Sequence, residues 1–168
     1  MEATDLRAAV VDIAVEFSAF YKTHFGRVYR AAWMVAGDEA AADEATQEAF
    51  ARAFARWRRL RDHDWAIGWV ITTALNVAKK QSRTVRRQLG TDVIDHAMPS
   101  TPAAARLDLR RALAELPSRQ RHALVLFYIG DLPVRAVAEA MNISEGTVKA
   151  HLAHGRTALR KRLEDRDE

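Results

Sequence analysis

The sequence of 168 residues contains no cysteine and few residues that interrupt helices, with only seven glycines and four prolines. Without cysteine the chain has neither a disulfide framework nor thiolate ligands for zinc. No apolar run approaches the roughly 20 residues that a membrane-spanning helix needs. The chain begins MEATDLR, which is acidic where a secretory signal would be basic. These absences predict a cytoplasmic protein.

The residues that are abundant favour a helical fold. Apolar side chains make up 49% of the chain, which is enough to bury a core. Alanine, leucine and arginine dominate, and all three are good helix formers. The formal net charge of +4 suits an anionic partner such as nucleic acid, although solvated basic faces give the same charge. The fold class is therefore predicted as all-α.

The helical pattern divides into two blocks, 12–88 and 104–163, joined by a short linker, 89–103, that contains Gly90, Pro99 and Pro102. In the first block we expect a helix that Gly37 ends at about residue 36, a helix over 39–60 that Asp38 caps, and a helix over 65–86. Phe50, Phe54 and Trp57 at i, i+4 and i+7 predict a core stripe. Residues 1–14 are expected to be a disordered lead or a partner contact.

The second block ends in two short helices joined by a tight turn at Asn142-Ile143, which predicts a helix-turn-helix. Before them, we expect Pro117-Ser118 to start a helix that Gly130-Asp131 ends. Ser144 is a good N-cap for the last helix because its hydroxyl can accept from a free backbone N–H. Gly146 costs about 1 kcal/mol against alanine inside a helix, which indicates that something must come close to the first turn.

The last helix has an apolar side and an outward side. Val148, Leu152 and Leu159 are expected to pack on the preceding helix. A helix that enters the major groove needs little bulk near the base edges, methyl groups for thymine and donors around them. The outward side fits this pattern, against the simpler interpretation of a solvated alanine-rich helix. Its residues are Gly146, Thr147, Lys149, Ala150, Ala153, His154 and Thr157, and Arg156 beyond them suits a phosphate contact.

The helix over 39–60 is divided by charge. Asp43, Glu44, Gln47 and Glu48 share one face near its start, and arginines including Arg56, Arg58 and Arg61 lie toward and just beyond its end. The helix dipole alone explains that polarity. The alternative is that the acidic face docks a basic protein surface while the arginine end meets nucleic acid.

The third helix places Trp65 and Trp69 at i and i+4, with Asn76, Lys79, Lys80 and Arg83 beyond them. Aromatic rings beside an amide and cations can stack on and bind unpaired bases. Periodicity alone favours the simpler interpretation, in which both tryptophans belong to the core.

Three segments of the chain, in their order, resemble the bacterial extracytoplasmic-function sigma factors of the sigma-70 family. They are DEATQEAF, GWVITTALNVAKK and ELPSRQRHALVLFYIGDLPVRAVAEAMNISEGTVKAHLAHGRTAL. The resemblance covers residues 15 to 163. It implies two helical domains, the first for core polymerase and the minus-ten element (12–88) and the second for the minus-thirty-five element (104–163). It implies core RNA polymerase and promoter DNA as partners, and commonly an anti-sigma factor, with no cofactor and no enzymatic activity.

The resemblance also implies residue roles. Asp43, Glu44, Gln47, Glu48 and Phe50 match the segment that binds the clamp helices of the polymerase, with Phe50 as a core support for that surface. Trp69 and Asn76 match the residues beside the melted minus-ten element, the loop 61–64 matches the loop that holds a flipped base, and Lys79, Lys80 and Arg83 would contact phosphates. Arg56, Arg58, Arg61 and Trp65 complete the predicted minus-ten set.

The predicted minus-thirty-five set is Ser144, Thr147, Lys149, Ala150, His151, Ala153, His154 and Arg156. Many family members carry a bulkier, arginine-rich surface there, whereas this chain has Ala153, His154 and Gly155. This difference predicts fewer direct base contacts.

Three alternatives remain open on the residues alone. SEGTVKAHL equally resembles the helix-turn-helix of LuxR-type regulators, which lack the acidic DEATQEAF segment. His151 and His154 at i and i+3 could hold a metal in an enzyme, but no third ligand of suitable spacing stands nearby. A structural helical adaptor is the third alternative.

Overall fold

The structure is a computed structural model that describes the backbone of residues 3–89 and 102–167. The first helical unit comprises α1 (Ala3–Trp33), α2 (Glu39–Ala55), α3 (Trp57–Leu60) and α4 (Ala66–Leu89). The second comprises α5 (Pro102–Ala114), α6 (Ser118–Leu124), the π-helix η1 (Val125–Ile129), α7 (Val134–Met141) and α8 (Glu145–Asp167). The described residues contain no strand, which confirms the all-α prediction. Most of the predicted linker, 90–101, lies outside the described residues.

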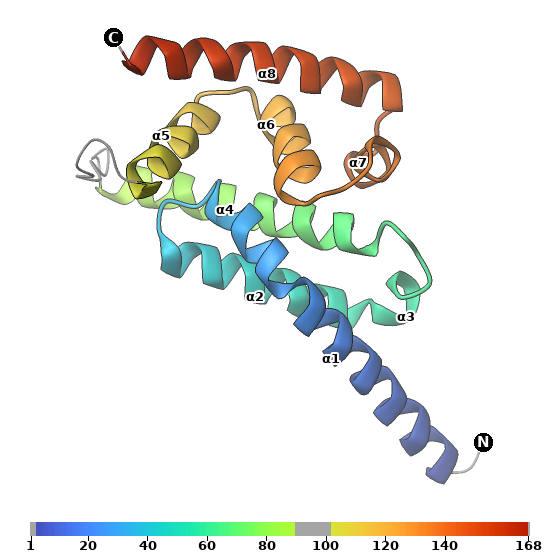
Figure 1. The fold of residues 1–168 in the computed structure, drawn as a ribbon. Helices are drawn as coiled ribbons and strands as arrows, with labels where there is room; N and C mark the ends of the chain where they lie inside the picture. Colours follow the sequence, from blue (N-terminus) through green and yellow to red (C-terminus); the bar gives the residue numbers. More distant parts are fainter. Residues whose placement is uncertain (1–2, 90–101, 168) are drawn as a thin grey trace.

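Both ends of α1 differ from the prediction. The helix already begins at Ala3 and projects beyond the other helices, so the expectation of a disordered lead is wrong for residues 3–14 (Figure 1). It ends at Trp33, three residues before the predicted end. The following turn is tighter than an α-helix, because Val35 N–H donates to the carbonyl of Ala32 at 3.0 Å.

Asp38 caps α2 as predicted, and its Oδ1 accepts from the backbone N–H of Ala41 at 2.8 Å. The single helix predicted over 39–60 is instead broken at Arg56, whose φ of −115° and ψ of 10° lie outside the helical region. The break turns Trp57 inward, where it is 4% exposed and its ring centroid lies 4.7 Å from that of Phe20.

An aromatic cluster fills the core between α1 and α2. Phe50 is 2% exposed, and its ring lies edge-on to Tyr21 at 4.7 Å and to Phe17 at 6.4 Å. The predicted core stripe is correct for Phe50 and Trp57 but wrong for Phe54, which is 51% exposed. The buried residues of α2 are Ala42, Ala45, Thr46, Ala49, Phe50 and Ala53, and Phe54 lies outside this face.

Local chemistry shapes the helix-turn-helix of α7 and α8. Asn142 adopts the left-handed conformation with φ 53°, and the N–H of Ile143 returns to the carbonyl of Ala138 at 3.0 Å. This arrangement satisfies the last carbonyls of α7. Ser144 Oγ then accepts from the N–H of Thr147 at 3.1 Å and caps α8 as predicted.

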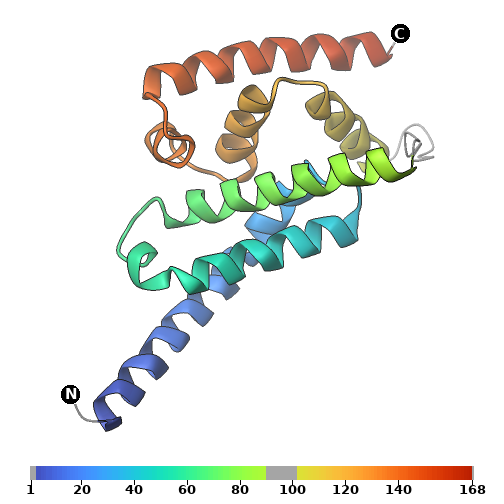
Figure 2. The same cartoon turned by 180° about the vertical axis from the view of Figure 1, so that it is seen from behind.

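The two units pack against each other. α6 and α7 lie in a layer between α4 and α8, as the two opposite views show (Figure 1, Figure 2). α7 contacts both α4 and α8. One hydrophobic cluster runs through both units and includes Ile71 and Leu75 of α4 together with Leu126 of η1 and Val137 of α7.

Candidate functional site

The acidic face of α2, which we define as Asp43, Glu44, Gln47 and Glu48, points away from the core. The first three residues are exposed, and Glu48 is half-buried with its Oε1 2.7 Å from Nε of Arg52. Phe50 is buried beneath this face. It can support the surface but cannot contact a partner itself.

A groove of about 960 Å³ between α2 and α4 brings together residues that were predicted for different partners. Glu44, Gln47 and Glu48 line one wall, and Asn76 and Lys80 line the other. The groove therefore presents carboxylates opposite an amide and a cation. The sequence did not indicate this juxtaposition, because the two walls are about 30 residues apart in the chain.

The loop between α3 and α4 presents an aromatic and cationic edge. Trp65 is half-buried and stacks on His63, with ring centroids 4.6 Å apart and planes at 18°. Trp69 is also half-buried, and the Arg56 guanidinium lies 5.7 Å from its ring centroid. Both tryptophans therefore keep part of their surface accessible, which a full core role would not allow. Asp62, His63 and Asp64 of the loop are exposed.

The arginines around this edge differ in their contacts. Arg61 Nη1 lies 3.0 Å from Oε2 of Glu16 on α1, which ties the loop to that helix. Arg58 is exposed on α3. Arg83 belongs to α4, but its side chain lies outside the described residues.

The two predicted lysines of α4 point in different directions. Lys80 is exposed at the groove, whereas Lys79 is half-buried and donates from Nζ to Oγ of Ser118 in the second unit. The structure therefore places Lys79 against α6 rather than beside Asn76 and Lys80.

The outward side of α8 has the predicted form. Val148 and Leu152 are buried against the unit, and the residues opposite them are exposed. Gly146 has open space above it, since an added Cβ would meet nothing closer than Ser144 Oγ at 3.8 Å. The exposed predicted residues are Ser144, Thr147, Lys149, Ala150, Ala153, His154 and Arg156, and His151 is half-buried.

Two residues of α8 differ from the sequence interpretation. Gly155 is buried, and a Cβ there would come within 3.0 Å of Leu124 Cδ1, so it belongs to the packing face and not to the outward surface. Arg156 turns to the flank of the helix, where its Nη1 donates to Oη of Tyr128 at 3.1 Å. Tyr128, which no sequence pattern singled out, is 55% exposed although it lies in the apolar run VLFYI.

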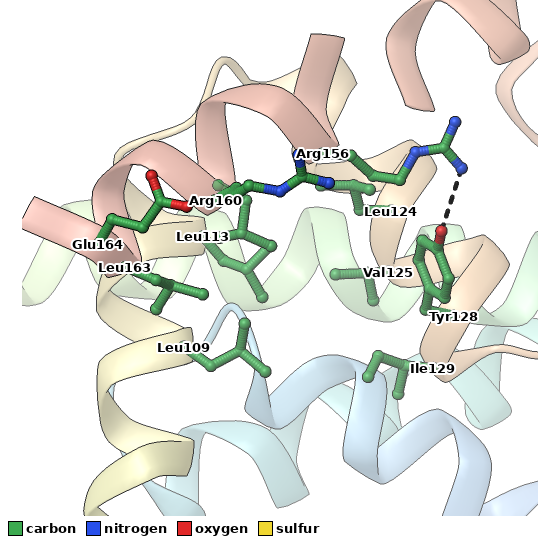
Figure 3. A pocket seen from close by; sticks show the side chains of 11 residues that line it. Leu109, Leu113, Leu124, Val125, Tyr128, Ile129, Arg156, Arg160, Leu163 and Glu164 are labelled. Atoms are coloured by element: carbon green, nitrogen blue, oxygen red, sulfur yellow. Dashed lines mark hydrogen bonds between the residues drawn. The ribbon is translucent and has the colours of Figure 1, made fainter. Parts of the chain in front are cut away.

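A largely apolar cavity of about 440 Å³ lies between α5, α6, η1 and α8 (Figure 3). Arg156, Arg160 and Glu164 of α8 form its polar edge. Its apolar lining comes from Leu109, Leu113, Leu124, Val125, Ile129, Leu159 and Leu163. The leucine spacing of α5 could have indicated this face, but only the fold shows that the elements leave a cavity.

His122 of α6 has a strongly lowered pKa. Burial lowers the pKa of its imidazole to about 4, and the cations Arg121, Lys79 and Arg119 add to the effect. Its Nε2 is buried and has no hydrogen-bond partner among the described residues. Its neutral form is therefore strongly favoured in the folded protein.

Within residues 3–89 and 102–167, no helix is long and apolar enough to cross a membrane. No group of three or more His, Asp or Glu side chains there is placed to hold a metal ion, so the pair His151 and His154 has no third ligand.

Comparison with known families matches both units. Residues 20–88 match the family Sigma-70 region 2, and residues 106–159 match the family Sigma-70, region 4. These two segments together make up more than half of the chain.

Several known proteins are similar over most of their length. The ECF RNA polymerase sigma factor SigL of Mycobacterium tuberculosis (strain H37Rv) is 30% identical over 94% of this chain and 94% of its own. The ECF RNA polymerase sigma factor SigW of Bacillus subtilis is 28% identical over 83% of this chain and 84% of its own. Among solved structures, sigma factor RpoE of Bartonella quintana, in complex with the anti-sigma factor NepR, matches with a TM-score of 0.69 at 19% identity. That match covers 88% of this chain and 96% of RpoE, and it supports the fold.

Proposed function

This chain belongs to the extracytoplasmic-function sigma factors of the sigma-70 family, and from this premise we propose how its surfaces direct core RNA polymerase to promoters. As a sigma factor it is a transcription initiation factor. The LuxR-type alternative is not favoured, because residues 20–88 match Sigma-70 region 2.

The acidic face of α2 is the proposed docking surface for core polymerase. Asp43 and Glu44 are exposed on α2, and the buried ring of Phe50 holds this helix against Tyr21 of α1. A negative surface of this kind would recruit a basic partner and set its orientation. Arg52 partly neutralises Glu48, so Asp43 and Glu44 carry most of the unpaired charge.

The edge formed by Trp65, Trp69 and the loop 61–64 is the proposed site for unpaired bases of the minus-ten element. A half-buried indole offers one face for stacking, and stacking on aromatic side chains is worth about 1–3 kcal/mol per base. Asn76 and Lys80 continue from this edge along α4 and would contact a base edge and a phosphate. Arg56 and Arg58 add positive charge beside the same edge.

The outward side of α8 is the proposed reader of the minus-thirty-five element. The observation that carries the proposal is the two-sided form of α8, the N-capped second helix of the helix-turn-helix. Val148 and Leu152 are buried on one side of it. The residues exposed on the other side are Thr147, Lys149, Ala150, Ala153 and His154. Lys149 and His154 supply donors, and the alanines allow close approach to base edges.

The proposed action needs only non-covalent binding. Each unit alone would bind DNA weakly, and joining both to one polymerase raises the effective concentration of the second contact after the first has formed. We also propose an anti-sigma protein as a regulatory partner, supported by the solved complex of the similar RpoE with NepR.

Run-off transcription with core polymerase tests this proposal. The chain should produce discrete new transcripts, and the double variant D43K/E44K should lose both these transcripts and co-migration with core polymerase. Asp12→Lys is the control, since it reverses a carboxylate on an exposed face of α1, with half the charge change of the double variant. Transcripts that survive in D43K/E44K would contradict the docking surface, and the absence of transcripts with the parent chain would contradict the function.

A further inference from the structure

A π-helix stands directly before the turn that leads into the helix-turn-helix. It is η1, which continues α6 without a gap. The N–H of Gly130 donates to the carbonyl of Val125, five residues back, at 2.8 Å. π-helices are rare, occur mostly as single turns inside α-helices, and are frequent at functional sites. The second unit therefore departs from regular helix geometry in η1, the element that carries Tyr128.

Tyr128 points outward from a segment whose first residues are core. Val125 and Leu126 are at most 1% exposed, whereas Tyr128 is 55% exposed. Its ring lies edge-on to the half-buried ring of Phe127, with the ring centroids 4.9 Å apart and the planes at 85°. This contact supports the tyrosine ring from one side only. Packing in the core therefore accounts for neither the exposed position of the ring nor its hydroxyl.

A glycine brings α8 within reach of that hydroxyl. Gly155 is buried, and an added Cβ would lie 3.0 Å from Cδ1 of Leu124 at the end of α6. Leu124 and Tyr128 line the same cavity as Arg156, the residue that follows Gly155. The missing side chain at Gly155 thus allows the close approach of α6 and α8, across which Arg156 reaches η1.

The arginine and the tyrosine are joined by one hydrogen bond. Nη1 of Arg156 donates to Oη of Tyr128 at 3.1 Å (Figure 3). A guanidinium carries five N–H donors in a fixed planar arrangement, and this bond uses one of them. Arg156 is exposed, so the bond directs its side chain without burying the group. The other donors can therefore bind an anion at the surface while Tyr128 fixes their direction.

Arg156 belongs to a row of exposed cations along one flank of α8. Lys149, Arg156 and Arg160 lie at i, i+7 and i+11, which places them on one side of the helix. This flank borders the outward side at Ala153, and the acidic Glu164 follows only one turn beyond Arg160. DNA phosphates line the groove that a recognition helix enters, and arginine binds phosphate oxygens with two parallel hydrogen bonds. The row is therefore placed to contact a phosphate backbone.

We propose that Tyr128 is a positioning residue for DNA binding, an inference that rests on the proposed function of α8. Its hydroxyl holds the Arg156 guanidinium toward a phosphate beside the minus-thirty-five element. An arginine without this bond would lose more rotamer freedom when it binds the phosphate, which weakens binding. Because a phosphate carries no sequence information, Tyr128 raises the affinity for promoter DNA and leaves the preferred sequence unchanged.

The variant Tyr128→Phe tests the proposal, because it removes the hydroxyl and keeps the ring. Core polymerase assembled with this variant should bind a promoter fragment about two- to tenfold more weakly, the range expected for one lost hydrogen bond. The slope of log K against log salt should not change, since the charge of Arg156 remains. Tyr21→Phe is the matched control, because it removes the same hydroxyl from a half-buried ring of the first unit and should bind like the parent.

The variant Arg156→Ala distinguishes positioning from an independent contact. It should weaken promoter binding more than Tyr128→Phe does and reduce the salt slope by about 1, as the loss of one phosphate contact predicts. Adding Tyr128→Phe to Arg156→Ala should cause no further loss, because the hydroxyl then has no guanidinium to hold. The same fold-loss from Tyr128→Phe in both backgrounds would overturn the positioning role, as would unchanged promoter binding in Tyr128→Phe alone.

Urea unfolding of the free chain distinguishes a purely structural bond. Tyr128 and Arg156 are both exposed, so Tyr128→Phe should unfold at the same urea concentration as the parent chain. A lower midpoint with unchanged promoter binding would show that the bond only stabilises the fold, and would overturn the proposal. If the parent chain adds no promoter binding to core polymerase, the proposed function fails instead.

Discussion

In the second unit the candidate DNA-binding residues lie along one helix, α8, whereas in the first unit they come from α3, the loop 61–64 and α4. The proposed contact surface of the second unit is thus one helix face, which sequence periodicity describes well. The first unit assembles its edge from segments that only the tertiary structure brings together. A helix face can lose one side chain and keep its shape, but the assembled edge depends on the aromatic core that positions its parts.

The largest expected effect is on the core of the first unit. Phe50→Ala should lower the free energy of unfolding by about 3–5 kcal/mol, because it removes a buried ring that packs against Phe17 and Tyr21. Phe54→Ala makes the same change at an exposed site and should cost about 1 kcal/mol or less. Urea unfolding measures both, and equal losses would contradict the burial difference.

The second-largest expected effect is a loss of folding stability at low pH, caused by His122. The pKa of His122 is about 4 in the folded chain against an ordinary 6.5, so the unfolded chain binds a proton first as the pH falls. Stability is therefore retained above about pH 6.5 and is lost as the pH falls toward 4. Between pH 7 and 5 this loss should be about 1–2 kcal/mol.

The variant His122→Leu isolates that contribution, because no proton can bind at residue 122. Burial and Arg27 also lower the pKa of His24, and that contribution should persist in the variant. Urea unfolding at pH 7 and pH 5 should show a smaller difference for His122→Leu than for the parent chain. Equal differences would show that His122 is not protected from protonation by the fold.

A further prediction separates phosphate contacts from base contacts on α8. Lys149→Ala should weaken binding of the holoenzyme to promoter DNA and reduce the slope of log K against log salt by about 1 if the lysine neutralises a phosphate. Lys22→Ala on α1 removes an equal charge from an exposed site outside the proposed interface. Matching slopes for the two variants would show that Lys149 does not neutralise a phosphate.

The smallest effects compare the helix caps of the two units. Asp38→Ala and Ser144→Ala should each cost about 1 kcal/mol of stability, because each side chain accepts a backbone hydrogen bond at a helix start. Only Ser144→Ala should also weaken binding to the minus-thirty-five element, since it loosens the first turn of α8. Unfolding and promoter binding of the two variants test this difference, and equal promoter binding would contradict it.

The sequence predicted the features that depend on residues close together in the chain. Both caps, the turn at Asn142, and the apolar side of α8 at Val148 and Leu152 follow from residue type and helical spacing. Phe54 was misassigned because the buried face of α2 runs through Ala49, Phe50 and Ala53, and spacing from Phe50 alone does not show which residues the neighbouring helices cover.

Other features depended on contacts between distant segments. The bond between Lys79 and Ser118, the pair Arg156 and Tyr128, and the groove shared by Glu44 and Asn76 each join residues that lie 28 or more positions apart. Helical periodicity identifies the face on which a residue lies but not the element that covers this face.

The division of labour between the two units is tested most directly by footprinting the holoenzyme on one promoter. DNase protection reports the upstream contact, and permanganate reactivity reports unpaired thymines downstream. The account predicts that Lys149→Ala weakens upstream protection. It predicts that Trp69→Ala reduces the permanganate-reactive thymines and leaves upstream protection in place. Loss of the same region in both variants would contradict the assignment of separate promoter elements to the two units.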